Sequence, residues 1–344
     1  MRVLHVCPTY FSADSIIAGG ERYSYGLAMT MAKVTPTTLV TFGDKEFIRK
    51  DGDLTVHCYR RWTYLHGSRA NPVSATFLKD VLSHDVVHCH QFMTVASDIA
   101  ILGGALARKK VFITDLGGSA GFSLSYHLPL WRAVREFLVI SEFNRDLFAS
   151  LALKKTVIYG GVDTDVFCPD ETKRTNRILF VGRLMPHKGV DLLIDALGPY
   201  MELDVVGQAP DAAYLASLKE KAKGRRVRFL EGTRDDALLG MYREAAVVAI
   251  PSRLDGGYTT ALEAMACCTP VVGTKVGSLP ELVEDGKTGF IVPCDDVEGF
   301  RARLCQLFDD RSLGACMGQA GRARVEAMFT WDRVVERCLR EYAA

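Results

Sequence analysis

Short runs rich in Val, Ile, Leu and aromatic residues alternate with helical stretches along this 344-residue chain. We expect strands at Val3–Cys7, Leu39–Phe42, Thr55–Tyr59, Val86–His90, Val111–Thr114, Phe137–Ile140, Thr156–Tyr159, Ile178–Val181, Leu203–Val206, Val227–Leu230 and Ala245–Ile250. Strands that alternate with helices form parallel sheets with helices on their faces. The chain is too long for one core of ordinary size, so the sequence predicts an α/β protein with two domains.

The composition excludes some classes of protein. With 48% hydrophobic and 24% charged residues and a net charge of +1, the chain lacks the strongly basic domain of a nucleic-acid binder. Its ten cysteines form no C-x-x-C pair, which favours free thiols in a reducing compartment over disulfides. The chain begins directly with a strand, and no apolar run approaches the length of a membrane span. We therefore expect a cytoplasmic protein, with a position on the membrane surface left open.

The stretch from 245 to 272 combines a buried strand, a glycine loop and a helix that begins at Thr259 or Thr260. Free backbone N–H groups and the positive end of the helix dipole make such a junction a site for anions. Asp255 and Glu263 flank the loop with seven residues between them. The geometry alone fits equally well an ordinary strand–helix turn with two surface acids.

Two other glycine loops follow strands. Gly19 and Gly20 precede a helix expected from Glu21, and a diglycine lets the backbone approach a phosphate or sugar closely. The loop from Gly182 to Gly189 carries Arg183 and Lys188. Arg183 offers bidentate hydrogen bonds and Lys188 a point charge, which suits a diphosphate. Taken singly, both cations fit ordinary surface positions; combined with the glycine loop and the downstream acids they favour phosphate binding.

The first half holds two further candidates. His88 and His90 lie on one face of their strand, and His90 stands at its carboxyl end, where open α/β sheets bind ligands. We therefore take His90 as a candidate contact to a donor sugar or an acceptor, and His88 as structural. The aromatic and basic residues at 60–64, with Arg49 and Lys50 nearby, fit a surface for anionic lipid or, more simply, a solvated loop.

Several segments carry a family resemblance. Asp255-Gly256, then Glu263-Ala-Met-Ala and Pro270-Val-Val, resemble the E-x7-E region of the retaining GT-B-fold glycosyltransferases of family 4, the glycosyl transferases group 1. Gly182-Arg-Leu-x3-Lys-Gly resembles that family's GR-L-x3-KG signature, and Gly160 to Phe167 resembles its interdomain connector. The resemblance implies two Rossmann-like domains with parallel sheets facing a central cleft. The acceptor domain would comprise 1–165 and a crossing helix at 329–344, and the nucleotide-sugar domain 166–328.

The resemblance also implies a reaction. A hexose-type sugar would pass with retention from a UDP- or GDP-sugar to a sugar, lipid-linked or small-molecule acceptor, in polysaccharide or glycolipid biosynthesis. No metal and no other cofactor would be needed. The implied catalytic residues are Arg183, Lys188, Asp255 and His90. The implied donor-binding residues are Gly19, Gly20, Arg183, Lys188, Gly232, Thr233, Asp255, Gly256, Gly257, Tyr258, Thr259, Thr260 and Glu263.

The chain departs from the family pattern in its implied sugar pocket. Asp255 stands where most relatives have Glu, Gly256-Gly257-Tyr258 replaces Gly-Phe-Gly, and Leu116 stands where a histidine is common. These departures leave two alternatives open. The chain would be a partner protein that binds nucleotide sugar without transferring it, or an epimerase of nucleotide sugars.

Overall fold

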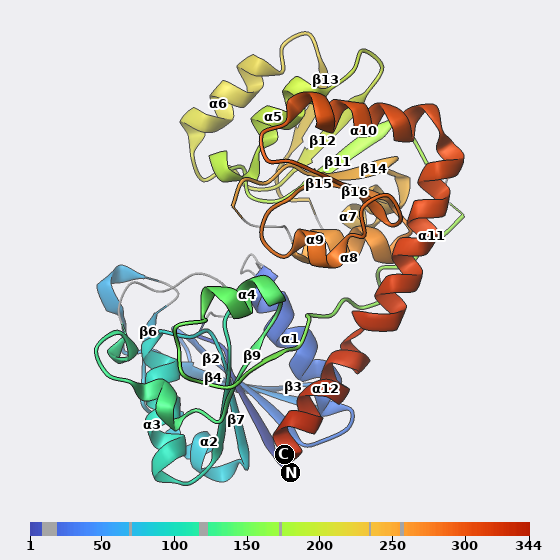
Figure 1. Ribbon diagram of the computed structural model, residues 1–344. Coiled ribbons are helices and arrows are strands. Elements are labelled where there is room, and N and C mark those ends of the chain that lie inside the picture. Colours follow the sequence, from blue (N-terminus) through green and yellow to red (C-terminus); the bar gives the residue numbers. More distant parts are fainter. Residues whose placement is uncertain (9–18, 69–70, 117–122, 172–173, 234, 255–257) are drawn as a thin grey trace. The chain divides into compact units, whose positions relative to one another are not determined.

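The computed structural model describes residues 1–8, 19–68, 71–116, 123–171, 174–233, 235–254 and 258–344. These residues form two compact units (Figure 1). The first comprises Met1–Gly161 and Trp331–Ala344, and the second Val162–Thr330. The boundaries expected from the sequence, after residues 165 and 328, differ from these by a few residues.

The first unit contains an eight-stranded sheet in the order β10-β9-β8-β7-β1-β2-β4-β3. Its strands are β1 (Val3–Val6), β2 (Thr37–Gly43), β3 (Phe47–Asp51), β4 (Leu54–Arg60), β7 (Val86–His90), β8 (Lys110–Thr114), β9 (Glu136–Val139) and β10 (Lys155–Val157). All neighbours pair in parallel except β3 and β4. A second, two-stranded sheet pairs β5 (Thr63–Tyr64) with β6 (Pro72–Val73).

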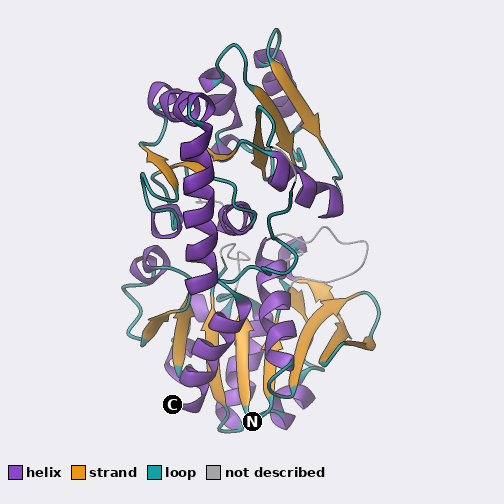
Figure 2. Ribbon diagram, turned by 90° about the vertical axis from the view of Figure 1, so that its right-hand side faces the viewer, coloured by secondary structure: helices purple, strands orange, loops and turns teal. Residues whose placement is uncertain are grey.

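Helices pack against this sheet (Figure 2). They are α1 (Gly19–Ala32), α2 (Leu78–Ser83), α3 (Val95–Leu106), α4 (Glu142–Leu147) and α12 (Trp331–Ala343), with 3-10 turns at Leu65–Gly67, Leu124–Tyr126 and Leu130–Ala133. The sequence analysis missed β3 and treated its Arg49 and Lys50 as part of a loop. The strand alternates half-buried and exposed residues and lies at the sheet edge, so it lacks the continuous apolar run of the buried strands.

The second unit contains a six-stranded sheet in the order β13-β12-β11-β14-β15-β16, with every pair parallel. Its strands are β11 (Arg177–Val181), β12 (Glu202–Val206), β13 (Arg226–Leu230), β14 (Val247–Ile250), β15 (Val271–Thr274) and β16 (Gly289–Val292). Its helices are α5 (Val190–Ala196), α6 (Ala212–Lys221), α7 (Asp235–Glu244), α8 (Tyr258–Ala266), α9 (Leu279–Leu282), α10 (Val297–Asp309) and α11 (Arg311–Met328), with a 3-10 turn, η4, at Pro186–Lys188.

The cores follow from the strand sequences. β14 is buried at every position, as is typical of a parallel strand covered on both faces. In the second unit, Leu193 of α5 and Phe300 of α10 are fully buried in the same core as Val205 of β12. The expected α/β class with two parallel sheets is confirmed. Among the described residues, no helix is both long and apolar enough to cross a bilayer.

The C-terminal helix α12 belongs to the first unit and packs there on α1. Trp331, its first residue, lies against two glycines that leave room for the indole ring. A Cβ atom added to Gly26 would come within 2.6 Å of that ring, and one added to Gly161 within 2.7 Å. At the other end of α12, the Tyr342 hydroxyl lies 2.6 Å from Nδ1 of His88 in the sheet. The helix is therefore attached to the first unit at both ends.

We predict that Gly26→Ala destabilises the first unit by about 1–3 kcal/mol, because the added methyl group overpacks the site of Trp331. The matched control is Gly240→Ala in the interior of α7, where an added Cβ meets nothing within 4 Å. There the exchange is expected to stabilise the helix by about 0.5–1 kcal/mol. Thermal unfolding of both variants checks the prediction, and a Gly26→Ala protein as stable as the wild type would contradict it.

Candidate functional site

In the second sheet, the chain order reverses between β11 and β14, which lie side by side (Figure 1). From β11 the chain proceeds outward to β12 and β13, and it then returns to the other side of β11 to form β14. Open α/β sheets bind ligands beyond the carboxyl ends of the strands at such a reversal. The segments that leave these two strands, 182–189 and 251–258, are those in which the sequence analysis placed phosphate-binding residues.

The backbone is closely packed at this edge of the sheet. Gly189 has a φ of +71° at the start of α5, and a Cβ atom there would lie 1.9 Å from the carbonyl oxygen of Pro251. A Cβ atom on Gly207, which follows β12, would lie 1.9 Å from the carbonyl oxygen of Gly182. A side chain at Gly189 or Gly207 would push the neighbouring backbone segments apart. Glycine at both positions therefore allows these segments to be in direct contact.

The two predicted cations lie on the segment that leaves β11. The Arg183 side chain is exposed and the Lys188 side chain is half-buried. Lys188 ends the turn η4, in which its backbone N–H donates to the Met185 carbonyl at 2.9 Å. The structure thus places both residues in one loop beyond the carboxyl end of β11, and their contact to a phosphate stays a prediction.

Helix α8 begins at Tyr258, so its first turn includes Thr259 and Thr260. The Thr260 hydroxyl donates to the carbonyl of Val181, the last residue of β11, at 3.4 Å. The start of α8 therefore lies next to the end of β11. The predicted residues Asp255, Gly256 and Gly257 are outside the part of the chain that the structure describes.

Glu263, expected to accept hydrogen bonds from a ribose, is buried in α8 with 7% of its surface exposed. One carboxylate oxygen accepts a hydrogen bond of 2.6 Å from the Tyr242 hydroxyl of α7. Burial first, and then the charge of Glu263, raise the pKa of Tyr242 well above its ordinary value, so the hydroxyl stays a donor. The sequence analysis did not find Tyr242, because nothing in its local sequence marks it as the partner of an acid twenty-one residues later.

The opposite end of α8 is held by two guanidinium groups. Arg174 donates to the carbonyls of Cys267 and Cys268 at 3.1 and 2.8 Å. Arg322 donates to the carbonyl of Ala266 at 2.9 Å. Cations favour the carbonyl end of a helix, whose last carbonyls lack partners within the helix. These bonds fix the axis of α8, and the sequence analysis did not predict them.

Gly232 and Thr233 follow β13, which lies two strands away from β11 in the sheet. Gly232 is exposed with a φ of +65°.

In the first unit, Gly19 and Gly20 open α1. The Cβ atom of Leu116 lies 3.7 Å from the position that a Cβ on Gly20 would take. The diglycine and the position where family members commonly have histidine are thus neighbours, but the intervening loops at 9–18 and 117–122 are outside the described residues.

His90 does not present its ring to solvent. It ends β7 as expected, yet only 1% of its surface is exposed, and Nε2 lies 2.7 Å from Nδ1 of His5 on β1. Nε2 of His5 lies 3.3 Å from the sulfur of Met31, which only accepts hydrogen bonds. We therefore assign the His5 proton to Nε2, and His90 then donates from Nε2 to His5. Among the described residues, Nδ1 of His90 has no partner.

His5, His88 and His90 form a buried polar layer, which we call the histidine layer. Their rings offer nitrogens within 4.8 Å of one another, a spacing that invites comparison with a metal site. Both ring nitrogens of His88 are engaged, by the hydroxyls of Tyr342 and Thr114 at 2.6 and 2.7 Å. The ring nitrogens of His5 and His88 contact other protein groups, as those of buried core histidines usually do. We therefore assign no metal ion to these residues. The structure supports the structural role expected for His88 and places His90 in the same layer.

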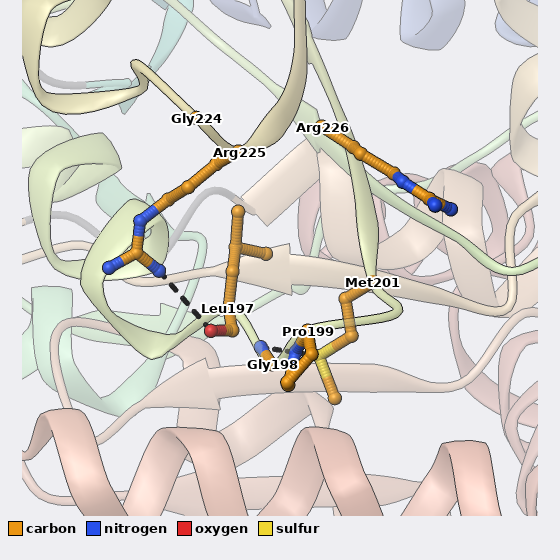
Figure 3. A pocket seen from close by; sticks show the side chains of 7 residues that line it. All are labelled: Leu197, Gly198, Pro199, Met201, Gly224, Arg225 and Arg226. Carbon is orange, nitrogen blue, oxygen red and sulfur yellow. Dashed lines mark hydrogen bonds between the residues drawn. The ribbon is translucent and has the colours of Figure 1, made fainter.

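A shallow hollow of about 300 Å³ also lies in the second unit (Figure 3). It is lined by Leu197, Gly198, Pro199, Met201, Gly224, Arg225 and Arg226. These residues precede β12 or begin β13, so the hollow is at the amino ends of the strands, opposite the edge described above. Arg225 already donates to the Leu197 carbonyl at 3.2 Å. We do not assign this hollow to the candidate site.

Comparison with known proteins identifies the family. The family of glycosyl transferases group 1 matches residues 163–324. The GDP-mannose-dependent alpha-(1-6)-phosphatidylinositol monomannoside mannosyltransferase of Mycolicibacterium smegmatis is 30% identical over 294 residues, which are 73% of this chain and 75% of that protein. The chain belongs to the group 1 glycosyltransferases.

Two further proteins show how much of the chain is similar to known glycosyltransferases. The D-inositol 3-phosphate glycosyltransferase of Corynebacterium aurimucosum is 33% identical over 201 residues, 51% of this chain and 48% of that protein, so the chain spans about half the length of this relative. Anabaena HepE, solved in complex with UDP, matches with a TM-score of 0.81 and 20% identity over 100% of both chains. The structural similarity confirms the expected GT-B fold.

We predict that protein stability falls at acidic pH because of the histidine layer. Burial, followed by the charges of neighbouring imidazoles, lowers the pKa of His5 to about 3 and the pKa values of His88 and His90 well below 6.5. The unfolded chain binds protons at these residues below about pH 6.5 and the folded chain does not. Above about pH 6.5 these histidines therefore leave the free energy of unfolding unchanged. As the pH decreases from about 6.5, each histidine lowers the free energy of unfolding by up to about 1.4 kcal/mol per pH unit.

Urea unfolding between about pH 5 and pH 8 measures this dependence. His5→Gln is expected to reduce the slope below pH 6.5 by one proton, whatever its effect on stability at neutral pH. His66→Gln, at an exposed position, is the control that keeps the slope. A His5→Gln protein with the wild-type slope would contradict the prediction, because His5 would then bind its proton equally in the folded and unfolded chains.

Proposed function

We propose that this protein is a retaining glycosyltransferase that moves a hexose-type sugar from a nucleotide-diphosphate sugar to an acceptor. The observation that carries the proposal is the meeting of two segments at the strand reversal of the second sheet. One bears Arg183 and Lys188, and the other leads into α8, whose Thr260 contacts the end of β11. This edge brings cations and the positive end of a helix dipole together, a combination that suits a diphosphate.

The roles of the residues follow from this arrangement. Arg183 and Lys188 neutralise the departing diphosphate, and the first N–H groups of α8 add to that stabilisation. Preorganised groups of this kind supply much of the rate enhancement of enzymes. Glu263, oriented by Tyr242, accepts a hydrogen bond from a ribose hydroxyl. Asp255, with Gly256 and Gly257, would hold the sugar hydroxyls; these three lie outside the described residues.

We further propose that the reaction needs no metal ion and proceeds by attack on the face that the leaving group vacates, with retention at the anomeric carbon. Two cations and a helix end meet the charge that a divalent ion would otherwise meet. Addition of a chelator such as EDTA to the purified protein tests this point. Turnover that persists supports the proposal, and turnover that is lost and restored by a divalent ion contradicts it.

The names of relatives guide the choice of substrates. The M. smegmatis relative is named for GDP-mannose and a phosphatidylinositol mannoside, and the C. aurimucosum relative for inositol 3-phosphate. HepE structures contain UDP or UDP-glucose. We therefore propose a UDP- or GDP-sugar as donor, and a sugar, a lipid-linked glycan or a small polyol phosphate as acceptor, in glycolipid or polysaccharide synthesis.

A panel of UDP- and GDP-sugars, each with and without acceptors, separates this proposal from its alternatives. A transferase releases nucleotide faster when the correct acceptor is present. A binding partner without transfer activity binds a nucleotide sugar and releases nothing with any acceptor. An epimerase converts the sugar without an acceptor. Mass spectrometry of the nucleotide sugar that co-purifies with the protein gives the donor to use first.

We predict that Arg183→Ala and Lys188→Ala each reduce kcat by about two orders of magnitude or more, since each removes a charge that stabilises the leaving diphosphate. Arg226→Ala is the matched control, because Arg226 lies at the opposite edge of the same sheet with 64% of its side chain exposed. Steady-state kinetics with the identified donor measure the effect. A variant with wild-type kcat would exclude the residue it lacks from the mechanism.

We propose a location in the cytoplasm, in peripheral contact with the membrane. All ten cysteines are free thiols, which suits a reducing compartment. Trp62 is 62% exposed beside the exposed Arg60, while Arg61 is paired with Asp44, so only part of the positive charge is available to lipid headgroups. Flotation with liposomes that contain anionic lipid tests the contact. A protein that stays at the bottom of the gradient at low salt contradicts it.

A further inference from the structure

Arg253 connects the two segments that meet at the strand reversal. It follows β14, and its guanidinium donates hydrogen bonds in three directions. Nη1 reaches the carbonyl of Pro186 in η4 at 2.7 Å. Nη1 and Nη2 reach the two carboxylate oxygens of Asp191 in α5, both at 2.9 Å. Nε reaches the carboxylate of Asp295 at 2.6 Å. A planar fork with fixed donors suits such simultaneous contacts.

The backbone of the same residue strengthens this connection. The Arg253 N–H donates to the carbonyl of His187 at 2.7 Å, so two successive carbonyls of η4 are bound by one residue. Gly189, directly after the turn, lies against the Pro251 carbonyl with no room for a Cβ atom. The turn that ends in Lys188 is thus fixed on the end of β14 by backbone contact and by a charged side chain.

Arg253 and Asp191 form an ion pair in which both groups are charged at neutral pH. Burial opposes ionisation of Asp191, but hydrogen bonds and charge from Arg253 outweigh it and hold the pKa of Asp191 below its ordinary value. Arg253 is 28% and Asp191 31% exposed, so water does not fully screen the pair. Several bonds on one guanidinium fix the geometry better than a single exposed ion pair does.

We infer that Arg253 is a positioning residue for the donor site. It does not itself contact the donor, and it acts by holding the Lys188 turn in register with the segment that leaves β14. The inference rests on the proposed function, in which Lys188 neutralises the diphosphate. Misplacement of a charged group by about an ångström lowers catalytic rates by up to about a hundredfold, so a fixed turn is of direct consequence for transfer.

A purely structural role for Arg253 is the competing explanation, and the same unit provides a matched control. Arg301 also binds a carboxylate with two bonds, to Glu298 at 2.8 and 3.0 Å. It also donates to the carbonyls of Asp195 and Ala196, at the far end of α5, and is 36% exposed. Arg301 therefore fixes the opposite end of the helix that Arg253 fixes near Lys188.

The experiment compares Arg253→Met with Arg301→Met by thermal unfolding and by calorimetric titration with UDP and GDP. We expect both variants to unfold at lower temperature and only Arg253→Met to bind the nucleotide about tenfold more weakly or worse. Arg253→Lys, which lacks the fork, is expected to recover only part of the affinity. Asp191→Asn, a milder disruption of the same contacts, serves if Arg253→Met does not fold, and it is expected to weaken binding in the same direction.

The deciding measurement is the effect of Arg253→Met on nucleotide binding in the presence and in the absence of the Lys188 side chain. If Arg253 acts by positioning Lys188, Arg253→Met weakens nucleotide binding much less in a Lys188→Met protein than in the wild type. Wild-type affinity in Arg253→Met, equal losses of affinity in the Arg301→Met control, or an additive double variant would overturn the inference while leaving the proposed function intact. A wild-type protein that binds no nucleoside diphosphate or nucleotide sugar would overturn both.

Discussion

The direct contact of backbone with backbone at the carboxyl ends of β11 and β14 is the constraint on which the candidate site depends. A parallel sheet whose order reverses between two neighbouring strands leaves the loops of both strands at one point. Here the two loops touch without intervening side chains, because Gly189 presents no Cβ to the Pro251 carbonyl. Arg253 then adds charged hydrogen bonds to the same junction. These contacts fix the backbone of the turn that ends in Lys188.

Arginine residues hold the second unit together around this site. Arg322 binds the last carbonyl of α8, Arg174 binds the two carbonyls that follow it, and Arg253 fixes the turn that ends in Lys188. A helix constrained at its far end keeps its N–H groups aimed at one spot, and preorganisation of this kind is what charge stabilisation requires. The Tyr242 hydroxyl orients the Glu263 carboxylate in a similar way, by a single hydrogen bond. Residues outside the family motif thus hold the helix and the acid that belong to the motif.

The first unit buries three imidazole rings in its core. The histidine layer lies between the sheet and helices α1 and α12, and its hydrogen bonds run to Met31, Thr114 and Tyr342. Neutral rings with such partners cost little to bury, whereas charged rings would cost much. Tyr342 closes the layer from the end of the chain, so the core of the first unit is complete only after α12 has docked. His90, expected as a contact to donor sugar or acceptor, is instead buried in this layer beside His5.

The sequence by itself determined the α/β class, the strands of the two large sheets except β3, β15 and β16, and the loops in which glycines and cations meet. These are local properties, since apolar runs mark buried strands and glycines mark turns and close approaches wherever the chain later folds. Only the tertiary structure decided which side chains surround the motifs. The contact of His90 with His5, the bond from Tyr242 to Glu263 and the contacts of Arg253 with Asp191 and Asp295 join residues far apart in the chain. Local sequence carries no signal for such pairs, because they form when separate elements pack against one another.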